Sequence, residues 1–468
     1  MIGVLVGTKL WHPFADMSAV QGNELVIASG EGAYVTDEAG RRYLDATAGL
    51  WYCNIGHGRR ELADAAAAQI GKIAAYSTFG NFATRPTLDL AERIAELAPM
   101  DDAVVFFTSG GSDSVDTAVK IVQRYWSLQG KPNKNLIFTR NKAYHGMHMA
   151  GTSLAGIEAN RTGFTSLLDS VVRVAWDDAD DLISELDRLG PDRVAAFFCE
   201  PIIGAGGVFA PPPGYLEKVR SACRERGVLF VADEVISGYG RTGHWFASDR
   251  WELDPDLILS AKGLTSGYLP MGAVLVSGAV AEPFWSRGGV FRHGYTYSGH
   301  ATAAAVALAN LDVLAREKLV QRVLDLEPVL AMALRPLMGS ELVVEVRAGV
   351  GLLAAVQLAP EAVAADVTLA PRVLAGLRER GVLTRLLADT SIQVSPAFVV
   401  TASDIALLAT AIAETLAELG SPVAIPVNIG DVDLLPEQTR DDTEAGWGSN
   451  VAATDEWYQA NRPPHHRD

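Results

Sequence analysis

The chain has 468 residues, too many for one simple core, so two or more domains are expected. Its formal net charge of −17 argues against nucleic acid or an anionic membrane as the partner. Three cysteines without CxxC spacing indicate a reducing compartment. No apolar run reaches the roughly 18 residues of a transmembrane helix, so we expect a cytoplasmic protein.

The N-terminal part contains short strands, loops and two helices. Ala33–Thr36 and Arg42–Asp45 flank the turn sequence DEAG and predict a hairpin. Trp51 follows in the aromatic, glycine-rich stretch AGLWYCNIGHG, where it either packs in the core or lines a pocket. The apolar spacing predicts helices over Glu61–Ile73 and Thr87–Leu97.

A strand, a glycine turn and a helix come next. Ala103–Thr108 reads as the strand, SGGSDS as the turn, and the helix carries its apolar face from about Asp113 onward. Such a turn presents backbone N–H groups and the Ser112 hydroxyl to an anion at the helix N-terminus, where the helix dipole favours negative charge. The same residues also fit an ordinary capped turn.

Strands and helices then alternate. Leu136–Thr139 and Val194–Cys199 predict strands, and Leu182–Leu189 and Tyr215–Glu225 predict helices. This alternation through residues 100–275 predicts an α/β fold with a mostly parallel sheet and helices on both faces.

Two apolar runs in the middle of the chain each lead to a charged residue. Gly227–Ala232 and Asp256–Ser260 predict buried strands, with Asp233 after the first and Lys262 after the second. In parallel α/β sheets, ligands bind at the carboxyl ends of the strands. A lysine there can form an imine with pyridoxal phosphate, and a carboxylate can pair with the protonated ring nitrogen. By spacing alone, a solvated lysine and a helix cap remain open alternatives.

The C-terminal third has shorter elements. A helix is predicted over 301–316, and a smaller α+β region follows, with candidate strands at Leu342–Val346, Leu352–Leu358 and Ile392–Val394. The acidic, aperiodic stretch at the end predicts a disordered or loosely docked tail. We therefore expect four parts: the N-terminal part of a small domain (1–60), a large cofactor-binding domain (61–310), the C-terminal part of the small domain (311–424) and the tail (425–468).

The stretches ADEVISGYGRTG and SAKGLTSGYLPMGAV around Asp233 and Lys262 resemble class III aminotransferases, a family of fold-type I pyridoxal phosphate enzymes. The resemblance covers about residues 9–420. It implies a large domain with a mostly parallel, seven-stranded type of sheet and a smaller α+β domain from both chain ends. It also implies that Lys262 carries the cofactor and moves the substrate proton, while Asp233 pairs with the ring nitrogen.

The resemblance assigns five further residues to the cofactor. Gly111 and Ser112 would bind the phosphate, Tyr144 and Val235 would pack on the two ring faces, and Thr296 would reach the phosphate in the neighbouring subunit. Shared sites imply a homodimer or tetramer. The phosphate loop departs from the family pattern, because Gly-Gly-Ser-Asp-Ser stands in place of Ser-Gly-Ser-Glu-Ala.

Four substrate residues are also implied. Arg385 matches the mobile arginine that binds the substrate carboxylate in two hydrogen bonds, although its interval to Ser395 is slightly longer than in close relatives. An exposed surface arginine is the alternative. Trp51 and Phe79 would line an apolar pocket. Glu200 either pairs with an arginine, as in some relatives, or caps a turn at the strand end.

No metal site is expected, because His145 and His148 lack further ligands at useful spacing. EPIIGAGGV resembles the ω-amino-acid:pyruvate branch. We therefore expect an aminotransferase that moves an amino group from an ω-amino acid or primary amine to a keto acid, with pyruvate as the expected acceptor, by a ping-pong mechanism. The alternatives are a 2-oxoglutarate-dependent transaminase of the 4-aminobutyrate, ornithine or diaminopelargonate type, or an aminomutase or racemase on the same scaffold. A non-catalytic binding protein is least favoured, because Lys262 is present.

Overall fold

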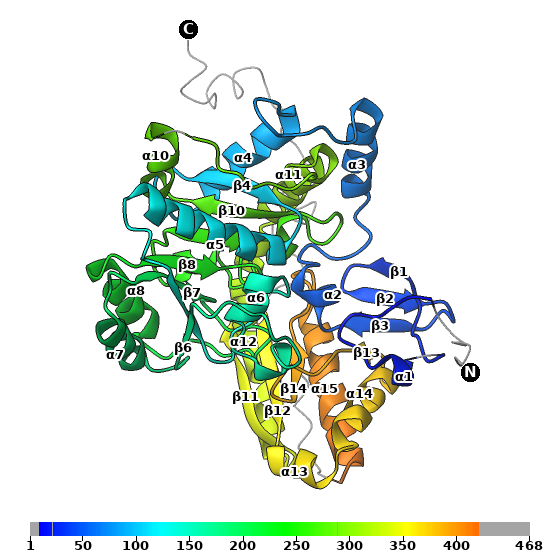
Figure 1. Ribbon diagram of the computed structural model, residues 1–468. Helices are drawn as coiled ribbons and strands as arrows, with labels where there is room; N and C mark the ends of the chain where they lie inside the picture. Colours follow the sequence, from blue (N-terminus) through cyan, green and yellow to red (C-terminus); the bar gives the residue numbers. More distant parts are fainter. Residues whose placement is uncertain (1–8, 21, 288, 421–468) are drawn as a thin grey trace, which may run out of the picture. The chain divides into compact units, whose positions relative to one another are not determined.

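Three β-sheets organise the part of the chain that the computed structural model describes, which is residues 9–420 without 21 and 288 (Figure 1). Within those residues, no helix is long and apolar enough to cross a membrane. The tail expected at 425–468 lies outside the described residues.

The largest sheet has seven strands in the order β4-β10-β9-β8-β7-β5-β6. Their bounds are β4 Val104–Thr108, β10 Gly272–Val276, β9 Leu257–Ser260, β8 Leu229–Asp233, β7 Val194–Cys199, β5 Leu136–Arg140 and β6 Val171–Val174. β10 runs antiparallel to both of its neighbours, and the pairs from β9 to β6 are parallel. The mostly parallel sheet expected from the sequence is confirmed.

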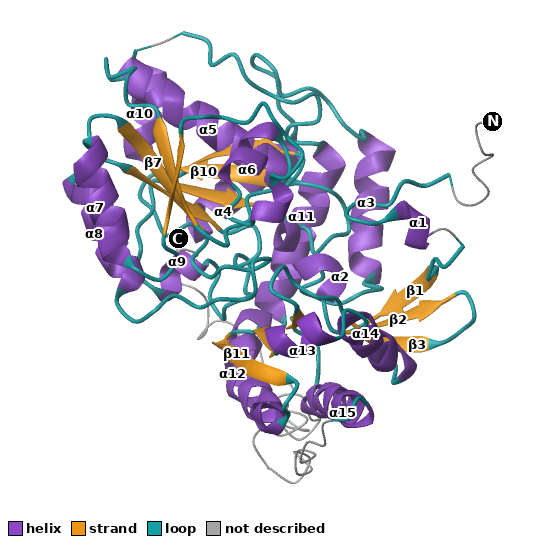
Figure 2. Cartoon of the chain, turned by 60° about the horizontal axis from the view of Figure 1, so that its bottom comes forward, coloured by secondary structure: helices purple, strands orange, loops and turns teal. Residues whose placement is uncertain are grey.

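Alternation along β8 explains why helices cover both faces of this sheet. Leu229 and Val231 pack into the apolar cluster under α5 (Gly111–Leu128). Phe230 points to the other face, where the Arg220 guanidinium of α8 (Tyr215–Glu225) lies 5.7 Å from its ring. Figure 2 shows α7 and α8 on one side of the sheet and α5 on the other. Asp233 continues the odd-numbered series and therefore faces the α5 side.

The remaining helices surround this sheet and the two smaller ones. α11 packs on α3 and α4, and α12 packs on α15. Their bounds, with those of the shorter helices, are α1 Met17–Val20, α2 Ala48–Trp51, α3 Arg60–Lys72, α4 Arg85–Leu97, α6 Met149–Leu154, α7 Ala179–Leu189, α9 Ala247–Arg250, α10 Gly278–Ser286, α11 Ala301–Arg316, α12 Leu319–Leu334, α13 Pro360–Ala365, α14 Leu369–Glu379 and α15 Ala402–Glu418.

The two smaller sheets come from the ends of the described chain. One has the order β1-β2-β3-β13 and contains β1 Ile27–Glu31, β2 Tyr34–Asp37, β3 Arg42–Asp45 and β13 Val382–Leu383. The other is antiparallel and contains β11 Val343–Val350, β12 Leu353–Leu358 and β14 Ser391–Val394. Because β13 pairs with β3, residues near both ends share one sheet. The domain boundaries expected from the sequence stay a prediction.

The elements predicted from apolar patterning are confirmed to within a few residues, but four strands were missed. β1 is almost wholly exposed and β6 is only partly buried, so neither shows a clear apolar pattern. β13 has two residues, too few for any pattern. β10 is fully buried, yet it follows a glycine- and proline-rich stretch that reads as a loop.

Candidate active site

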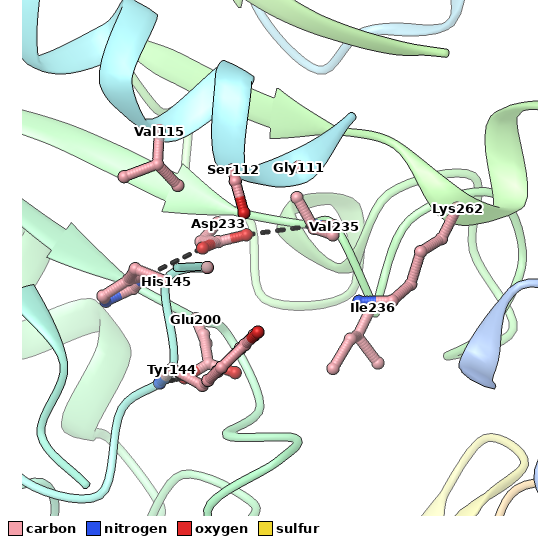
Figure 3. A pocket seen from close by; sticks show the side chains of 11 residues that line it. Gly111, Ser112, Val115, Tyr144, His145, Glu200, Asp233, Val235, Ile236 and Lys262 are labelled. Carbon is pink, nitrogen blue, oxygen red and sulfur yellow. Dashed lines mark hydrogen bonds and ion pairs between the residues drawn. The ribbon is translucent and has the colours of Figure 1, made fainter. Parts of the chain in front are cut away.

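Asp233 and Lys262 lie at the carboxyl ends of the adjacent strands β8 and β9. Figure 3 shows both side chains at a cavity of about 140 Å³, with Lys262 on one side and His145 on the other. The cavity is lined by residues from several strand ends and loops: Gly111, Ser112, Val115, Tyr144, His145, Gly146, Glu200, Asp233, Val235, Ile236 and Lys262. Seven of the residues predicted from the sequence therefore meet at one place.

The Lys262 amine is suited to nucleophilic attack. Burial lowers the pKa of Lys262 to about 8, and the charge of Arg385 acts in the same direction, while Asp233 and Glu200 oppose the shift. A pKa near 8 leaves a useful fraction of neutral amine at physiological pH. Lys262 also has a φ of 43°, in the left-handed region, and such backbone strain is found at functional sites.

Asp233 is held in place by two hydrogen bonds. Nδ1 of His145 lies 2.7 Å from its Oδ2, and the backbone N–H of Val235 donates to its Oδ1 at 3.2 Å. His145 is fully buried, and its Nε2 has no hydrogen-bond partner among the residues that the structure describes. The sequence pattern around His145 raised only a metal ligand, and the contact with Asp233 was missed because the two residues lie far apart along the chain.

The N-terminus of α5 forms a close-fitting cradle beside this pair. The Ser112 hydroxyl accepts a hydrogen bond from the Met147 backbone at 3.1 Å. A Cβ atom at Gly146 would lie 2.4 Å from that hydroxyl oxygen, and one at Gly111 would lie 2.9 Å from the Val235 side chain. Only glycine permits both approaches, and all three residues of this close-packed turn, Gly111, Ser112 and Gly146, line the cavity at the positive end of the helix.

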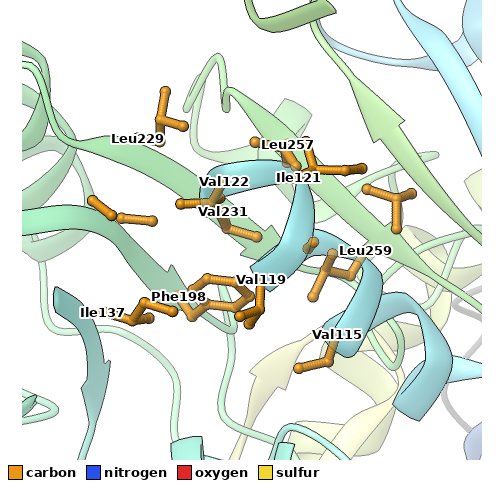
Figure 4. Close-up of a cluster of buried hydrophobic side chains, with 14 of the residues drawn as sticks. Val115, Val119, Ile121, Val122, Ile137, Phe198, Leu229, Val231, Leu257 and Leu259 are labelled. Carbon is orange, nitrogen blue, oxygen red and sulfur yellow. The ribbon is translucent and has the colours of Figure 1, made fainter. Parts of the chain in front are cut away.

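Packing of α5 on the sheet fixes the position of this cradle. Figure 4 shows Val115, Val119 and Val122 of the helix against side chains of β8 and β9, including Val231 and Leu259. Val115 also lines the cavity, so the same helix face joins the core to the site. Removing a buried valine side chain would therefore disturb the cradle as well as the core.

Two departures of the loop from the family pattern are accommodated. Oδ2 of Asp113 accepts from the Ser109 backbone at 3.0 Å, so the shorter acid caps the turn. The Ser114 hydroxyl is buried, where it hydrogen-bonds the Thr108 hydroxyl at 2.8 Å and the Gly110 carbonyl at 3.1 Å. Both polar side chains are thus satisfied inside the loop.

Glu200 connects two loops next to the cavity. Its carboxylate accepts from the backbone N–H of Tyr144 and of Gly204, each at 3.0 Å. Burial raises the pKa of Glu200. These partners match the strand-end capping alternative, and a contact of Glu200 with substrate stays a prediction.

Trp51 and Arg385 meet beside Lys262. The Arg385 guanidinium lies 4.4 Å from the centre of the Trp51 ring, and the Lys262 amine lies 5.8 Å from it. Trp51 is 2% exposed and packs with Ile202 and Leu387, so it belongs both to the core and to the site. Arg385 is half-buried, and its Nε donates to the Gln393 side chain at 2.7 Å. The alternative of an exposed surface arginine is therefore wrong.

Phe79 and Thr296 lie away from this cavity within the chain. Phe79 is 55% exposed and lines a separate apolar groove of about 740 Å³ together with residues 290–294. Thr296 is exposed on the segment that follows. Their predicted contacts with substrate and with a second subunit's cofactor stay predictions. In the described part of the chain, no group of three or more His, Cys, Asp or Glu side chains is placed to hold a metal ion.

The donor set of this cavity fits pyridoxal phosphate. It combines an amine of lowered pKa, a carboxylate held by a histidine, and a helix N-terminus whose close-packed turn needs glycine at positions 111 and 146. These match the aldehyde, the ring nitrogen and the phosphate of that cofactor.

Comparison with known proteins agrees with this geometry. The family model described as "Aminotransferase class-III" matches residues 17–416. A putrescine–pyruvate aminotransferase of Pseudomonas aeruginosa is 39% identical, with 84% of this chain and 91% of the relative covered. A transaminase of the marine bacterium Virgibacillus has 38% identity and a TM-score of 0.84, covering 88% of this chain and 98% of its own. An (S)-enantioselective omega-transaminase from Thermomicrobium roseum has 38% identity and a TM-score of 0.83, covering 87% and 96%. The chain therefore belongs to the class III aminotransferases and is a pyridoxal phosphate-dependent enzyme.

Proposed function

We propose that this enzyme transfers an amino group from an ω-amino acid or primary amine to pyruvate by a ping-pong mechanism. The observation that carries the proposal is the arrangement of the Lys262 amine between the Asp233 carboxylate and the stacked pair of Trp51 and Arg385. Relatives named for putrescine, β-alanine and ω-amino acids as donors, each with pyruvate as acceptor, support this choice.

Pyridoxal phosphate, when bound, supplies an electrophilic carbon and an electron-withdrawing ring. Lys262 would hold the cofactor through its amine, and the freed amine would take the proton from the amine-bearing carbon of the donor. Asp233, oriented by His145, would supply the negative charge opposite the ring nitrogen. Ser112 and the α5 N-terminus would bind the phosphate, with Tyr144 and Val235 on either face of the ring.

Arg385 distinguishes the two substrates of the cycle. Its guanidinium fork pairs with the carboxylate of the keto acid in the second half-reaction. A donor amine without a carboxylate near its amino group makes no use of Arg385 and contacts Trp51 instead. The same cavity can therefore serve both half-reactions.

Assembly into a homodimer or tetramer is part of the proposal. Thr296 is exposed and next to the apolar groove that contains Phe79, so both are available to a second chain. Thr296 of that chain would complete the phosphate site. All three cysteines are unpaired and buried, which supports the expected cytoplasmic location.

A second candidate function uses 2-oxoglutarate as the acceptor. The 4-aminobutyrate type has a named relative, a gamma aminobutyrate transaminase of Solanum lycopersicum that is 38% identical over 351 residues, with 70% of this chain covered; its name gives the donor and no acceptor. The same residues would carry the chemistry, and only the recognition of the second carboxylate would differ.

The test is the visible spectrum of the purified holoenzyme before and after an amine donor, followed by a keto acid. Addition of 3-aminopropanoate or 1-phenylethylamine should bleach the yellow colour, and pyruvate should restore it. Restoration by 2-oxoglutarate alone would favour the second candidate. A spectrum indifferent to both keto acids would favour an aminomutase or racemase.

A further inference from the structure

Arg385 lies on a short hairpin, and its guanidinium contacts the Trp51 ring. We call residues 385–393 the Arg385 hairpin. Its backbone pairing joins the Gln393 N–H to the Arg385 carbonyl at 3.0 Å and the Leu387 N–H to the Ser391 carbonyl at 2.8 Å. Asp389 lies at the tip, next to Thr390 with a φ of 64°. The second arm, residues 391–393, belongs to β14 and pairs with β12, so the sheet holds that arm. The first arm and the tip have few backbone bonds to the rest of the described chain, so side chains attach them to it.

Arg347 of β11 supplies that attachment. Its side chain is 9% exposed and donates to Asp389 Oδ2 and to the Ser391 hydroxyl, each at 2.5 Å. Its Nε donates to the Gly207 carbonyl at 2.8 Å, and the third nitrogen donates to Gln357 at 2.6 Å. A planar guanidinium with all its nitrogens bonded is a rigid connector. We call Arg347 and Asp389 the Arg347 clamp.

The turn at 203–209 links the clamp to the cavity. Gly204 donates to Glu200, whose other oxygen accepts from Tyr144 at the cavity wall. At the other end of the turn, a Cβ atom at Gly207 would lie 2.5 Å from Oδ2 of Asp389, so glycine is needed for the carboxylate to approach. The Ala388 N–H also reaches the Ala205 carbonyl at 3.4 Å. The hairpin is thus fastened to a turn that contacts the active site.

The Phe209 ring also packs against the guanidinium of the clamp residue Arg347. The Arg347 guanidinium lies 4.2 Å from the centre of the Phe209 ring, and the Lys142 amine lies 3.7 Å from the same centre. Cations near the ring faces are attracted by the π-electrons. The position of Arg347 is therefore fixed by stacking as well as by hydrogen bonds.

We propose that Arg347 and Asp389 are positioning residues that hold the Arg385 hairpin against the turn at 203–209, and so set the affinity of the enzyme for its keto acid. This inference rests on the proposed function of Arg385 as the carboxylate ligand. Within the described part of the chain, the Arg385 side chain has one hydrogen bond, to Gln393, so its placement over Trp51 depends on where the hairpin lies. A looser hairpin weakens carboxylate binding but leaves a carboxylate-free amine unaffected.

The first test is Asp389→Asn, which removes the charge and keeps the shape. The KM for pyruvate should rise by about five- to tenfold, the size of a coupling within one side-chain network. The kcat at saturating pyruvate and the rate of the half-reaction with 1-phenylethylamine should stay unchanged, because uniform carboxylate binding affects KM alone. The control is Asp366→Asn, which removes an exposed ion pair to Arg372 at 3.0 Å and should change neither half-reaction.

A double-mutant cycle separates the clamp from the fold. Arg385→Ala should raise the KM for pyruvate, and adding Asp389→Asn to it should cause no further increase, because the clamp acts through Arg385. If Asp389→Asn fails to fold, Arg347→Lys is the second variant, because it retains the charge but loses the fork. It should raise the KM for pyruvate by less than the roughly five- to tenfold expected for Asp389→Asn.

The outcomes are distinguishable. A wild-type enzyme that does not convert pyruvate overturns the proposed function and the clamp with it. An unchanged KM in Arg385→Ala overturns the role of Arg385 and the clamp that depends on it. If Arg385→Ala acts as expected while Asp389→Asn lowers only the melting temperature, or slows both half-reactions equally, the clamp is a structural ion pair and the inference is wrong.

Discussion

The two ends of the proposed active site are built in different ways. The cofactor end consists of Ser112, Asp233 and Lys262. Ser112 lies at the start of the long helix α5, and the other two residues lie at the ends of strands in the seven-stranded sheet. The substrate end (Trp51 and Arg385) comes from an irregular N-terminal segment and a hairpin, joined by side-chain contacts. Changes at the cofactor end should therefore slow both half-reactions, while changes at the substrate end should separate them.

Removal of Lys262 should have the largest effect. Lys262→Ala removes both the attachment point and the proton carrier, so both half-reactions should fall by about 10⁴-fold or more. Borohydride reduction followed by peptide mass spectrometry should find no covalent cofactor in this variant. The control is Lys134→Met, because burial also lowers the pKa of Lys134 to about 8, yet its amine binds the Pro191 carbonyl away from the site. Full turnover by Lys262→Ala would contradict the assignment of Lys262 to the cofactor end.

Neutralising Asp233 should rank second. Asp233→Asn leaves the ring nitrogen without a counter-charge, so the rates of both half-reactions should fall by the same factor, on the order of 10²–10³. Stopped-flow measurement of each half-reaction checks this. Asp256 lies at the opposite end of β9 and accepts from the Phe230 backbone at 2.7 Å. Asp256→Asn should lower the melting temperature without this kinetic loss. If Asp233→Asn slowed the two half-reactions by different factors, Asp233 would not behave as a cofactor-end residue.

Ser112→Ala should have a smaller effect, confined to cofactor binding. Loss of a hydrogen bond to a charged group is worth about 1.5–3 kcal/mol, so the affinity for pyridoxal phosphate should fall by about 10- to 100-fold. Equilibrium dialysis against the free cofactor measures the change. Ser127→Ala, in the last turn of the same helix, should not alter it. Equal affinity in both variants would remove Ser112 from the phosphate site.

The pH dependence of cofactor attachment should show the smallest change. In protein freed of cofactor, the neutral fraction of Lys262, with its pKa of about 8, rises about tenfold between about pH 7 and pH 9, and the attachment rate should follow. The folded state binds fewer protons than the unfolded state between about 8 and the usual 10.5, so the stability of the cofactor-free protein should rise with pH in that window. A rate midpoint near 10.5 would show that the amine is not buried.

From the sequence, more of the proposed cofactor end than of the proposed substrate end could be predicted to lie together. Buried parallel strands give continuous apolar runs, so the charged residues after β8 and β9 stood out as Asp233 and Lys262. The contact between His145 and Asp233 could not be predicted in this way, because it joins two strand ends that are distant in sequence.

At the substrate end, the contact between Arg385 and Trp51 depended on the resemblance, and Arg347 was not considered. Arg347 lies in a strand whose exposed positions carry no apolar signal, and its partners come from three separate segments. Long-range side-chain networks of this kind leave no local pattern in a single sequence.

The pairing of β13 with β3 has a consequence for how the chain assembles. Ser112, Asp233 and Lys262 all precede the C-terminal third, so this region can collapse while later parts of the chain are still being synthesised, and the proposed contact of Thr296 is added on assembly. The substrate end forms later, because Trp51 packs with Leu387, which lies near the opposite end of the described chain. Closing so long a loop is slow, so we expect a folding intermediate that captures the cofactor before it can select a keto acid.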